Sequence, residues 1–326
     1  MDFLHNAQTA LTQVIMLYVM VAIGVIGDRL GWFTSSIAQT CTKLLFFIVT
    51  PCVMLRSFFS LENTPQTLRG FAIAVFCGIV MHIVGILLSE PFFRNRSANG
   101  SESVLHFASI YGNCGYMALP LAQALAGTEG VFYGSAIILT FQIFSFTHGE
   151  YVMSGGIPFQ KHGKDGIVVN FQPKSLLLNA GVLSVLVGLP LFLLRVNVPA
   201  ALTSPINSIA AMNSPLAMLI FGAHLSHTKL GSVFQNKKII ATIVIKLFAV
   251  PACILLVFRL FHAQGDALVT AVLISASAPS ANNTVVFAAK HGRDAGYAAQ
   301  AVAVVSFLSV LTMPCVIALG RLGGTA

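Results

Sequence analysis

Two stretches of the sequence place asparagine beside helix-interrupting residues in otherwise apolar surroundings. Residues 111–120 contain Asn113 between two glycines, and residues 275–284 contain Asn282 and Asn283 after a proline. Proline removes a backbone donor and clashes with the preceding turn, while glycine loosens the backbone. Interrupted helices present N-termini whose partial positive charge attracts anions, and asparagine adds hydrogen-bond donors. The stretches predict an anion site formed by Gly112, Asn113, Cys114, Gly115, Tyr116, Pro279, Ser280, Asn282, Asn283 and Thr284, with helix breaks at Pro120 and Pro279.

Several basic side chains lie within apolar runs, where a charge is costly. Lys246 is expected either to hold the anion site as a positive charge or to bond a backbone carbonyl at a broken helix. His82 occupies the equivalent place in the other half of the chain. Lys43 is a further candidate for the charge or coupling site, with its ammonium group reaching the interface as the alternative. His148 and His224 are candidate proton carriers, although single membrane histidines more often bond neighbouring helices.

The composition indicates a membrane protein. Of 326 residues, 56% are hydrophobic and 9% are charged, and the mean hydropathy is +0.85. A soluble domain carries roughly a quarter charged residues, so lipid must surround the apolar side chains here. The net charge of +8 does not indicate nucleic-acid binding, because the basic residues are scattered between apolar runs. The six cysteines show neither metal-binding nor disulfide spacing, and no metal or cofactor is expected.

Ten runs are long and apolar enough to cross a bilayer, which requires about 20 residues. They are residues 10–27, 36–55, 70–89, 103–127, 130–147, 175–194, 205–226, 239–258, 267–289 and 295–320. The first run follows a segment without Lys or Arg and is expected to be a permanent helix rather than a cleaved signal peptide. The predicted fold class is therefore an all-α integral membrane protein with ten transmembrane helices. Its parts are residues 1–152, a short linker at 153–174, and residues 175–326.

The basic residues predict the orientation. Eleven lie between spans on one side and five on the other, and with Lys43 and Lys246 they account for all eighteen. The richer side is expected to be cytoplasmic. Both termini then lie outside the cytoplasm and the linker lies inside, in a multi-pass protein of the inner or plasma membrane.

Short matches between the two halves recur at a nearly constant offset. Residues 50–55 resemble residues 214–219 at an offset of 164, and residues 126–129 resemble residues 291–294 at an offset of 165. Because each half has five spans, the copies must be inverted relative to each other, as is typical of secondary transporters. The alternative is that the prolines merely kink packed helices and the asparagines bond neighbouring helices. That alternative is weaker for two repeat-related helices than for one.

These motifs also carry a family resemblance. Asn113-x3-Met117-x2-Pro120-Leu121 resembles the fourth helix of the auxin efflux carrier family, in the bile/arsenite/riboflavin transporter superfamily. Pro279-x3-Asn283-x3-Phe287-Ala288 resembles its ninth helix, and Lys246-Leu247-x3-Pro251 is similar to bacterial members. The resemblance covers essentially the whole chain, and the short linker favours a bacterial type.

The resemblance implies a fold in which broken helices 4 and 9 cross at mid-membrane. Helices 1, 2, 6 and 7 would form a scaffold, and helices 3–5 and 8–10 a transport domain that moves as an elevator. It implies a carrier of small organic anions, such as malonate or malate in bacterial members, working by alternating access. It also places Gln142 on a helix that faces the substrate, and Lys246 where sodium sits in related folds.

Other functions remain as alternatives. A sodium-coupled symporter of the bile-acid type would share the architecture, but the acidic side chains expected near its crossing are missing. A sensor would need a signalling domain, and a channel would not need the inverted repeat. An enzyme is not expected, because no nucleophile, base or metal constellation occurs. The expected partners are an organic anion, membrane lipid and, in a homodimer, a second copy of the chain.

Overall fold

The computed structural model describes residues 15–16, 19–93, 100–155, 159–161, 167–169, 179–226, 237–261 and 265–322. After a helical segment at 19–29, the elements of the first half are α2 (Ser35–Leu44), η1 (Leu45–Val49), α3 (Thr50–Ser60), α4 (Pro65–Ser89), α5 (Ser101–Ile110), η2 (Cys114–Ala118), α6 (Leu119–Phe144), η3 (Ser145–Gly149) and α7 (Glu150–Met153). Those of the second half are α9 (Ala180–Leu193), α10 (Ala200–Ala211), α11 (Asn213–Ser226), α12 (Lys237–Val244), η5 (Ile245–Ala249), α13 (Val250–Phe261), α14 (Asp266–Ser277), α15 (Asn283–Lys290) and α16 (Ala295–Leu322). The η segments are π-helical turns.

The predicted linker at 153–174 is described only in part. Two strands, β1 (Phe159–Lys161) and β2 (Ile167–Val169), pair antiparallel within it. Outside the described residues lie the rest of the linker, the side chain of His224 and part of the first predicted span. The linker therefore contains a short hairpin that its polar composition did not predict.

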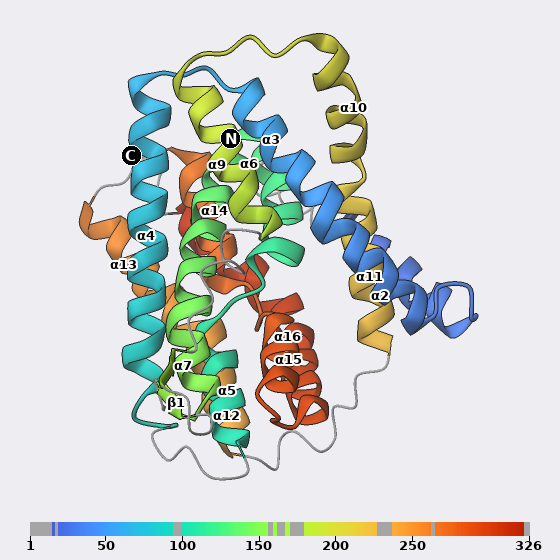
Figure 1. Ribbon diagram of the computed structural model, residues 1–326, viewed down its shortest axis with the longest axis vertical. Coiled ribbons are helices and arrows are strands. Elements are labelled where there is room, and N and C mark those ends of the chain that lie inside the picture. Colours follow the sequence, from blue (N-terminus) through green and yellow to red (C-terminus); the bar gives the residue numbers. More distant parts are fainter. Residues whose placement is uncertain are drawn as a thin grey trace.

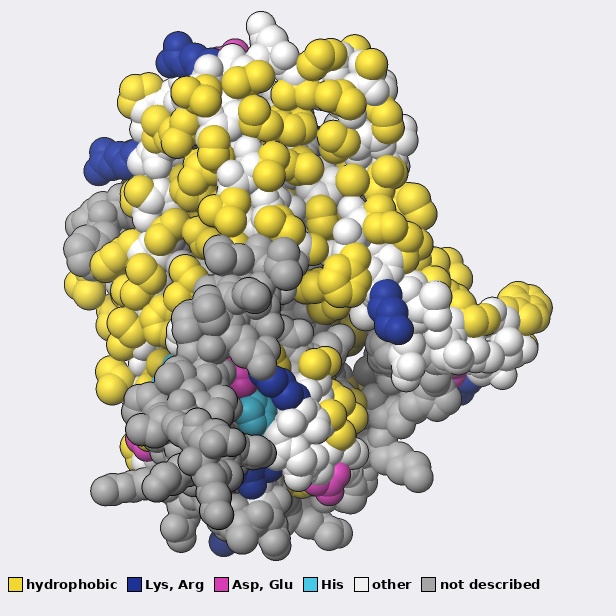
Figure 2. Space-filling model, in the orientation of Figure 1, with side chains coloured by type: hydrophobic (Ala, Val, Ile, Leu, Met, Phe, Trp, Pro, Cys, Tyr) yellow, Lys and Arg dark blue, Asp and Glu magenta, His cyan; other side chains and the backbone are white. Residues whose placement is uncertain are grey.

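The described helices suit a bilayer. Six segments are long and apolar enough to cross one: Ser36–Ser60, Pro65–Ser89, Cys114–Met153, Ala200–Ala223, Lys237–Leu260 and Ala295–Gly320. Large apolar side chains such as Phe47, Leu87 and Leu311 are more than 60% exposed. Figure 2 shows hydrophobic side chains over most of the described surface of one face, with charged side chains mostly toward its upper and lower ends. Such an apolar band has lipid as its natural solvent.

Two helices are interrupted where the sequence predicts interruptions. Helix α5 ends at Ile110 and η2 starts at Cys114, while α14 ends at Ser277 and α15 starts at Asn283. Residues 111–113 and 278–282 between them are non-helical apart from short turns. Here these two interruptions together are called the crossing.

Glycines mark the ends of the interrupted helices. Gly127, at the boundary predicted between the fourth and fifth spans, has φ 59° and ψ −147°, which no helix permits. The chain turns back there, since Gly134 lies against Leu119. Gly292, between α15 and α16, has a similarly left-handed φ of 63°. A left-handed φ is accessible to glycine at little cost, so these residues are suited to the two reversals.

Pro120 does not break a helix, which corrects the prediction made for it. It lies inside the helix that runs from η2 into α6, before the reversal at Gly127, while the break lies upstream at residues 111–113. Pro51, Pro120 and Pro251 each follow the end of a π-helical segment by two residues. A proline ring clashes with the carbonyl of the preceding turn, and a wider π turn relieves that clash. Proline therefore widens these helices, and only Pro279 lies within an interruption.

Small residues let the helices approach closely. Gly222 of α11 faces Val21 and Gly24 of the first helical segment, and a side chain on Gly222 would collide with the backbone of Val21. Gly78 of α4 is equally close to Thr140 of α6. Close contact through small residues is how membrane helices associate without a hydrophobic driving force.

The helices gather in two groups. Helices α2 and α3 contact α11 and α10 along one side of the bundle, while α4, α6 and α14 pack together on the other (Figure 1). Helix α9 contacts both α3 and α6. The crossing lies within the second group and faces the first.

Candidate functional site

The backbones of the two interruptions satisfy one another. The N–H of Asn113 donates to the carbonyl of Pro279 at 2.7 Å, and the N–H of Ala281 donates to the carbonyl of Tyr111 at 2.9 Å. Gly112 and Ser280 thereby form an isolated antiparallel bridge. Irregular backbone in a membrane protein must be paired within the protein or face water. The pairing explains how both helices tolerate a break at the same place.

Asn113 also starts the helix that follows it. Its Oδ1 accepts a hydrogen bond from the N–H of Tyr116 at 3.1 Å, which is the usual role of an asparagine at a helix N-terminus. The carbonyl oxygen of the side chain is thus occupied, and its NH2 group is the part that can donate to a ligand. Asn282 stands at the corresponding start of α15, immediately before Asn283. Two helix N-termini with asparagine therefore adjoin the crossing.

A small cavity lies beside these N-termini. Its volume of about 20 Å³ is enough for one water molecule but not for a carboxylate, so binding one requires the walls to separate. Eight residues predicted for the site line it: Gly112, Asn113, Cys114, Gly115, Tyr116, Gln142, Asn282 and Asn283. None of the described residues that line it is acidic.

Three predicted residues do not line the cavity. The carbonyl of Pro279 is used in the bridge, the hydroxyl of Ser280 donates to the carbonyl of Ala108 at 2.6 Å, and Thr284 is fully buried. Pro279 and Ser280 thus hold the interruption together, while the Thr284 hydroxyl has no hydrogen-bond partner among the described residues.

Six further residues line the cavity and were not predicted from the sequence: Phe46, Thr50, Ile138, Phe141, Gly181 and Ala281. Phe46 stacks on Tyr116 with ring centroids 5.5 Å apart. Thr50 precedes Pro51 in the repeated motif at 50–55, so that match was a signal pointing to this region. The other five carry no distinguishing pattern in an apolar sequence.

Gln142 lies between the cavity and α9. Its Nε2 donates to Asn179 Oδ1 at 2.9 Å, and that oxygen also accepts from the N–H of Gly181 at 2.9 Å. Because Asn179 presents an oxygen, Gln142 must direct its NH2 group toward it. The Oε1 of Gln142 is left buried, without a partner among the described residues. An acceptor of this kind suits a ligand that carries a hydroxyl or a protonated carboxyl group.

Lys246 is fully buried beside the crossing. Its Nζ donates to the carbonyl of Ala276, in the last turn of α14, at 3.3 Å. A side chain on Gly112 would place its Cβ 2.7 Å from Nζ, so the glycine makes room for the ammonium group. Carbonyls at a helix C-terminus carry partial negative charge, which a cation stabilises. This bond to the broken helix agrees with one of the two interpretations of Lys246 from the sequence, and a role in holding an anion stays a prediction.

The other two predicted charges, His82 and Lys43, lie in different parts of the structure. His82 is fully buried on α4, its Nδ1 donates to the carbonyl of Gly78 at 2.6 Å, and its ring lies 5.8 Å from that of Tyr111. Lys43 is exposed on α2 and does not line the cavity. The structure thus brings His82 and Lys246 to the same interruption and leaves Lys43 apart.

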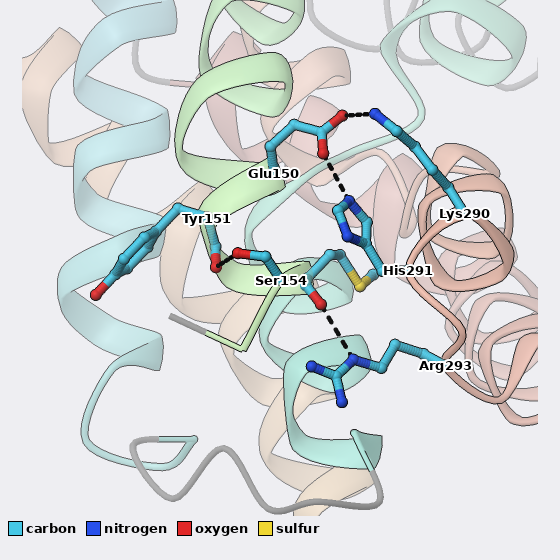
Figure 3. Close-up of polar contacts among 7 residues, drawn as sticks. Glu150, Tyr151, Ser154, Lys290, His291 and Arg293 are labelled. Carbon is cyan, nitrogen blue, oxygen red and sulfur yellow. Dashed lines mark hydrogen bonds and ion pairs between the residues drawn. The ribbon is translucent and has the colours of Figure 1, made fainter. Parts of the chain in front are cut away.

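A second polar group, here called the Glu150 cluster, joins the end of α7 to the turn between α15 and α16 (Figure 3). Glu150 is 3% exposed and pairs with Lys290, while its other oxygen bonds His291 Nε2 at 2.6 Å. Arg293 donates from Nε to the carbonyl of Met153 at 3.1 Å. In this cluster the carboxylate and the cations compensate one another.

Comparison with known proteins agrees with the transport architecture. The chain matches the family described as "Membrane transport protein" over residues 9–156 and 167–317. It is 24% identical over 305 residues to an uncharacterised transporter of Methanocaldococcus jannaschii, covering 92% of this chain and 95% of the relative. It is 25% identical over 302 residues to a Rhizobium meliloti protein named "Putative malonate transporter", covering 91% of this chain and 89% of the relative.

The family match spans both halves of the chain and both interruptions, and the relatives align over nearly their whole length. Of the residues that suggested the resemblance, Asn113 and Asn283 line the cavity and Pro279 belongs to the paired interruption. The chain belongs to the membrane transport protein family, the auxin efflux carrier family that its motifs resemble.

Proposed function

We propose that the protein is a secondary carrier of small organic anions, chiefly carboxylates such as malonate, and that it binds them at the crossing. The observation that carries this proposal is the paired interruption, where two helix N-termini with asparagine adjoin a cavity whose described lining contains no acidic residue, and a buried lysine lies beside Gly112. Helix N-termini and buried ammonium groups favour anions. The name of the Rhizobium meliloti relative supports malonate as the first compound to test.

The proposed mechanism is alternating access in a fold of two inverted five-helix repeats. Gly100 and Gly265 both have left-handed φ angles and precede α5 and α14, at an offset of 165. Gly127 and Gly292 recur at the same offset of 165, after the second parts of the interrupted helices. Glycines with positive φ that recur at a constant spacing in the two halves support an internal repeat.

The residues that line the cavity also support a proposed movement of one group of helices relative to the other. Phe46, Thr50 and Gly181 belong to the proposed scaffold, whereas the crossing belongs to the proposed transport domain. A substrate held between two bodies can be exposed on either side when one slides past the other. Because the cavity now has room for about one water molecule, such a movement would also have to widen it.

Both termini are proposed to lie outside the cytoplasm of a cell membrane. Impermeant labelling of single cysteines introduced at Gly163 and Thr325, both outside the described residues, tests this. In intact cells we expect labelling at Thr325→Cys and protection at Gly163→Cys. The reverse pattern would invert the proposed orientation.

The binding proposal is tested most sharply at Asn113. Asn113→Asp keeps an oxygen for the Tyr116 N–H, so the helix start survives, but replaces the NH2 donor with negative charge. We expect malonate affinity of the purified protein to fall on the order of a hundredfold, since a bond to a charged group contributes about 1.5–3 kcal/mol. Asn113→Ser keeps both a cap and a donor and should lose much less. Equal affinities for the two variants would contradict the proposal.

Asn283 offers an independent test on the other helix. Asn283→Ala should weaken malonate binding about ten- to a hundredfold without altering expression or monodispersity. Asn207→Ala is the control, because Asn207 is exposed on α10. Unchanged affinity at both asparagines would place the site elsewhere, and loss of folding in Asn283→Ala would mean that this residue is structural.

A further inference from the structure

A line of titratable side chains leads from an exposed end of α4 to the crossing. Glu90, which follows α4, has a side chain 44% exposed, and its Oε2 lies 3.5 Å from Nε2 of the fully buried His106. The rings of His106 and His148 are nearly perpendicular, with centroids 5.9 Å apart. His148 Nδ1 lies 3.0 Å from the hydroxyl of Tyr111. Tyr111 is the residue whose carbonyl takes part in the bridge between the interruptions.

The hydrogen bonds at the inner end fix where protons sit. The hydroxyl of Tyr111 donates its one proton to the carbonyl of Phe144 at 2.9 Å. His148 Nδ1 must therefore carry a hydrogen and donate to the Tyr111 oxygen. In neutral His148 this leaves Nε2 as the basic nitrogen. A proton that reaches Nε2 converts the ring to an imidazolium ion that still donates to Tyr111.

His148 lies in a π-helical turn. It belongs to η3, and π-helical turns are frequently found at functional sites. Lys246 lies in another π-helical segment, η5. The ring of Phe141, which lines the cavity, is 6.1 Å from the ring of Tyr111. A charge that forms on His148 is therefore separated from the proposed anion site by the rings of Tyr111 and Phe141.

Other titratable groups surround this line from the neighbouring elements. They are His82 on α4, Cys114 on η2, Lys246 on η5, Tyr151 on α7, the Glu102–Lys238 pair of α5 and α12, and the Glu150 cluster. Glu102 and Glu150 each have a lysine partner. The line through His106 and His148 ends at Glu90, whose side chain is 44% exposed.

We propose that Glu90, His106, His148 and Tyr111 form a proton path that couples anion transport to proton transport, an inference that rests on the proposed carrier function. A proton accompanies the anion to the crossing and is held on His148 Nε2. It leaves through His106 and the Glu90 carboxylate, or moves in the reverse order during export. Only N–H and O–H bonds form and break, and one water between the imidazole rings would suffice to connect them. The positive charge of the imidazolium ion offsets one negative charge of the anion during the movement.

The test uses purified protein in liposomes, with labelled malonate as the probe and a trapped pH-sensitive dye. Wild type should exchange malonate at equal pH and should also accumulate it when the outside is acidic, with acidification of the lumen. With one proton per malonate and no membrane potential, a gradient of about one pH unit drives about tenfold accumulation. His148→Gln and His106→Gln should retain exchange but lose the accumulation and the lumen acidification, and Tyr111→Phe should lose these same two proton-driven activities.

Tyr133→Phe is the matched control, since the Tyr133 hydroxyl donates to Glu129 at 3.0 Å, away from the path. It should keep both activities, and a loss of accumulation there as in Tyr111→Phe would overturn the assignment. Exchange in wild type with neither accumulation nor lumen acidification under the pH gradient would overturn the proton path and leave the carrier function intact. Absence of malonate binding and exchange would overturn both for this substrate. If a path variant does not fold, the wild-type proton measurement decides alone.

Discussion

The crossing and the Glu150 cluster compensate buried charge in opposite ways. In the Glu150 cluster a carboxylate faces a lysine and a histidine, so the group is satisfied within the protein. At the crossing, Lys246 bonds a backbone carbonyl, and the described lining of the adjacent cavity contains no acid. A helix end offers only partial charge against a full positive charge. We therefore propose that the crossing retains positive potential for a ligand, whereas the Glu150 cluster joins two elements.

Among the changes that test this contrast, replacing Lys246 should have the largest effect on malonate affinity. Lys246→Met keeps the length of the side chain but removes the charge, and malonate affinity should fall on the order of a hundredfold. Folding stability should not fall comparably, because an apolar side chain replaces a buried ion. Malonate titration and thermal unfolding of the purified variant measure both. Lys43→Met, on the exposed face of α2, is the comparison, and an equal loss of affinity there would indicate a general charge effect.

Adding a single methyl group at Gly112 should have an intermediate effect. The Cβ of Gly112→Ala would stand 2.7 Å from Lys246 Nζ and push the ammonium group away, lowering malonate affinity about tenfold. Gly85→Ala is the control, because its Cβ would meet Ile110 at 3.4 Å, an ordinary contact. In the double variant Gly112→Ala/Lys246→Met, the glycine change should add little further loss. Additive losses would show that Gly112 acts independently of Lys246.

Breaking the Glu150 cluster should change stability and not affinity. Glu150→Gln leaves Lys290 and His291 without their carboxylate, but Lys290 is 38% exposed, so water replaces part of the interaction. We expect a loss on the order of 1–3 kcal/mol, less than for a fully buried pair. Thermal unfolding should show a lower midpoint, while malonate titration stays near wild type. A weakened affinity at normal stability would contradict the division between the two regions.

Replacing sodium should have the smallest effect. Because Lys246 lies at the crossing and no described residue that lines the cavity is acidic, we expect that sodium is not needed to hold the anion. Malonate exchange in proteoliposomes should continue at a similar rate when potassium or choline replaces sodium. An absolute sodium requirement would instead favour the sodium-coupled symporter.

The sequence predicted the elements of the crossing because proline, glycine and asparagine have local effects on a helix. Asn113, Pro279 and Asn282 lie at or beside the interruptions for reasons that act within a few residues. Helix ends were less well predicted. Helix α3 extends to Ser60 and α4 starts at Pro65, beyond the apolar runs, because an apolar run marks lipid contact and a helix can continue past it.

By itself the sequence determined the lipid solvent, the family and the break at Pro279, since these follow from composition and local backbone chemistry. It placed the other break at Pro120, whereas the structure has it at residues 111–113. Only the tertiary structure decided that Tyr111 and Ala281 pair and that Phe46, Thr50 and Gly181 reach the cavity. These contacts join different helices, and no local pattern encodes them. The same holds for His148 and Tyr111, whose hydrogen bond exists because one π-helical turn places that imidazole beside the end of α5.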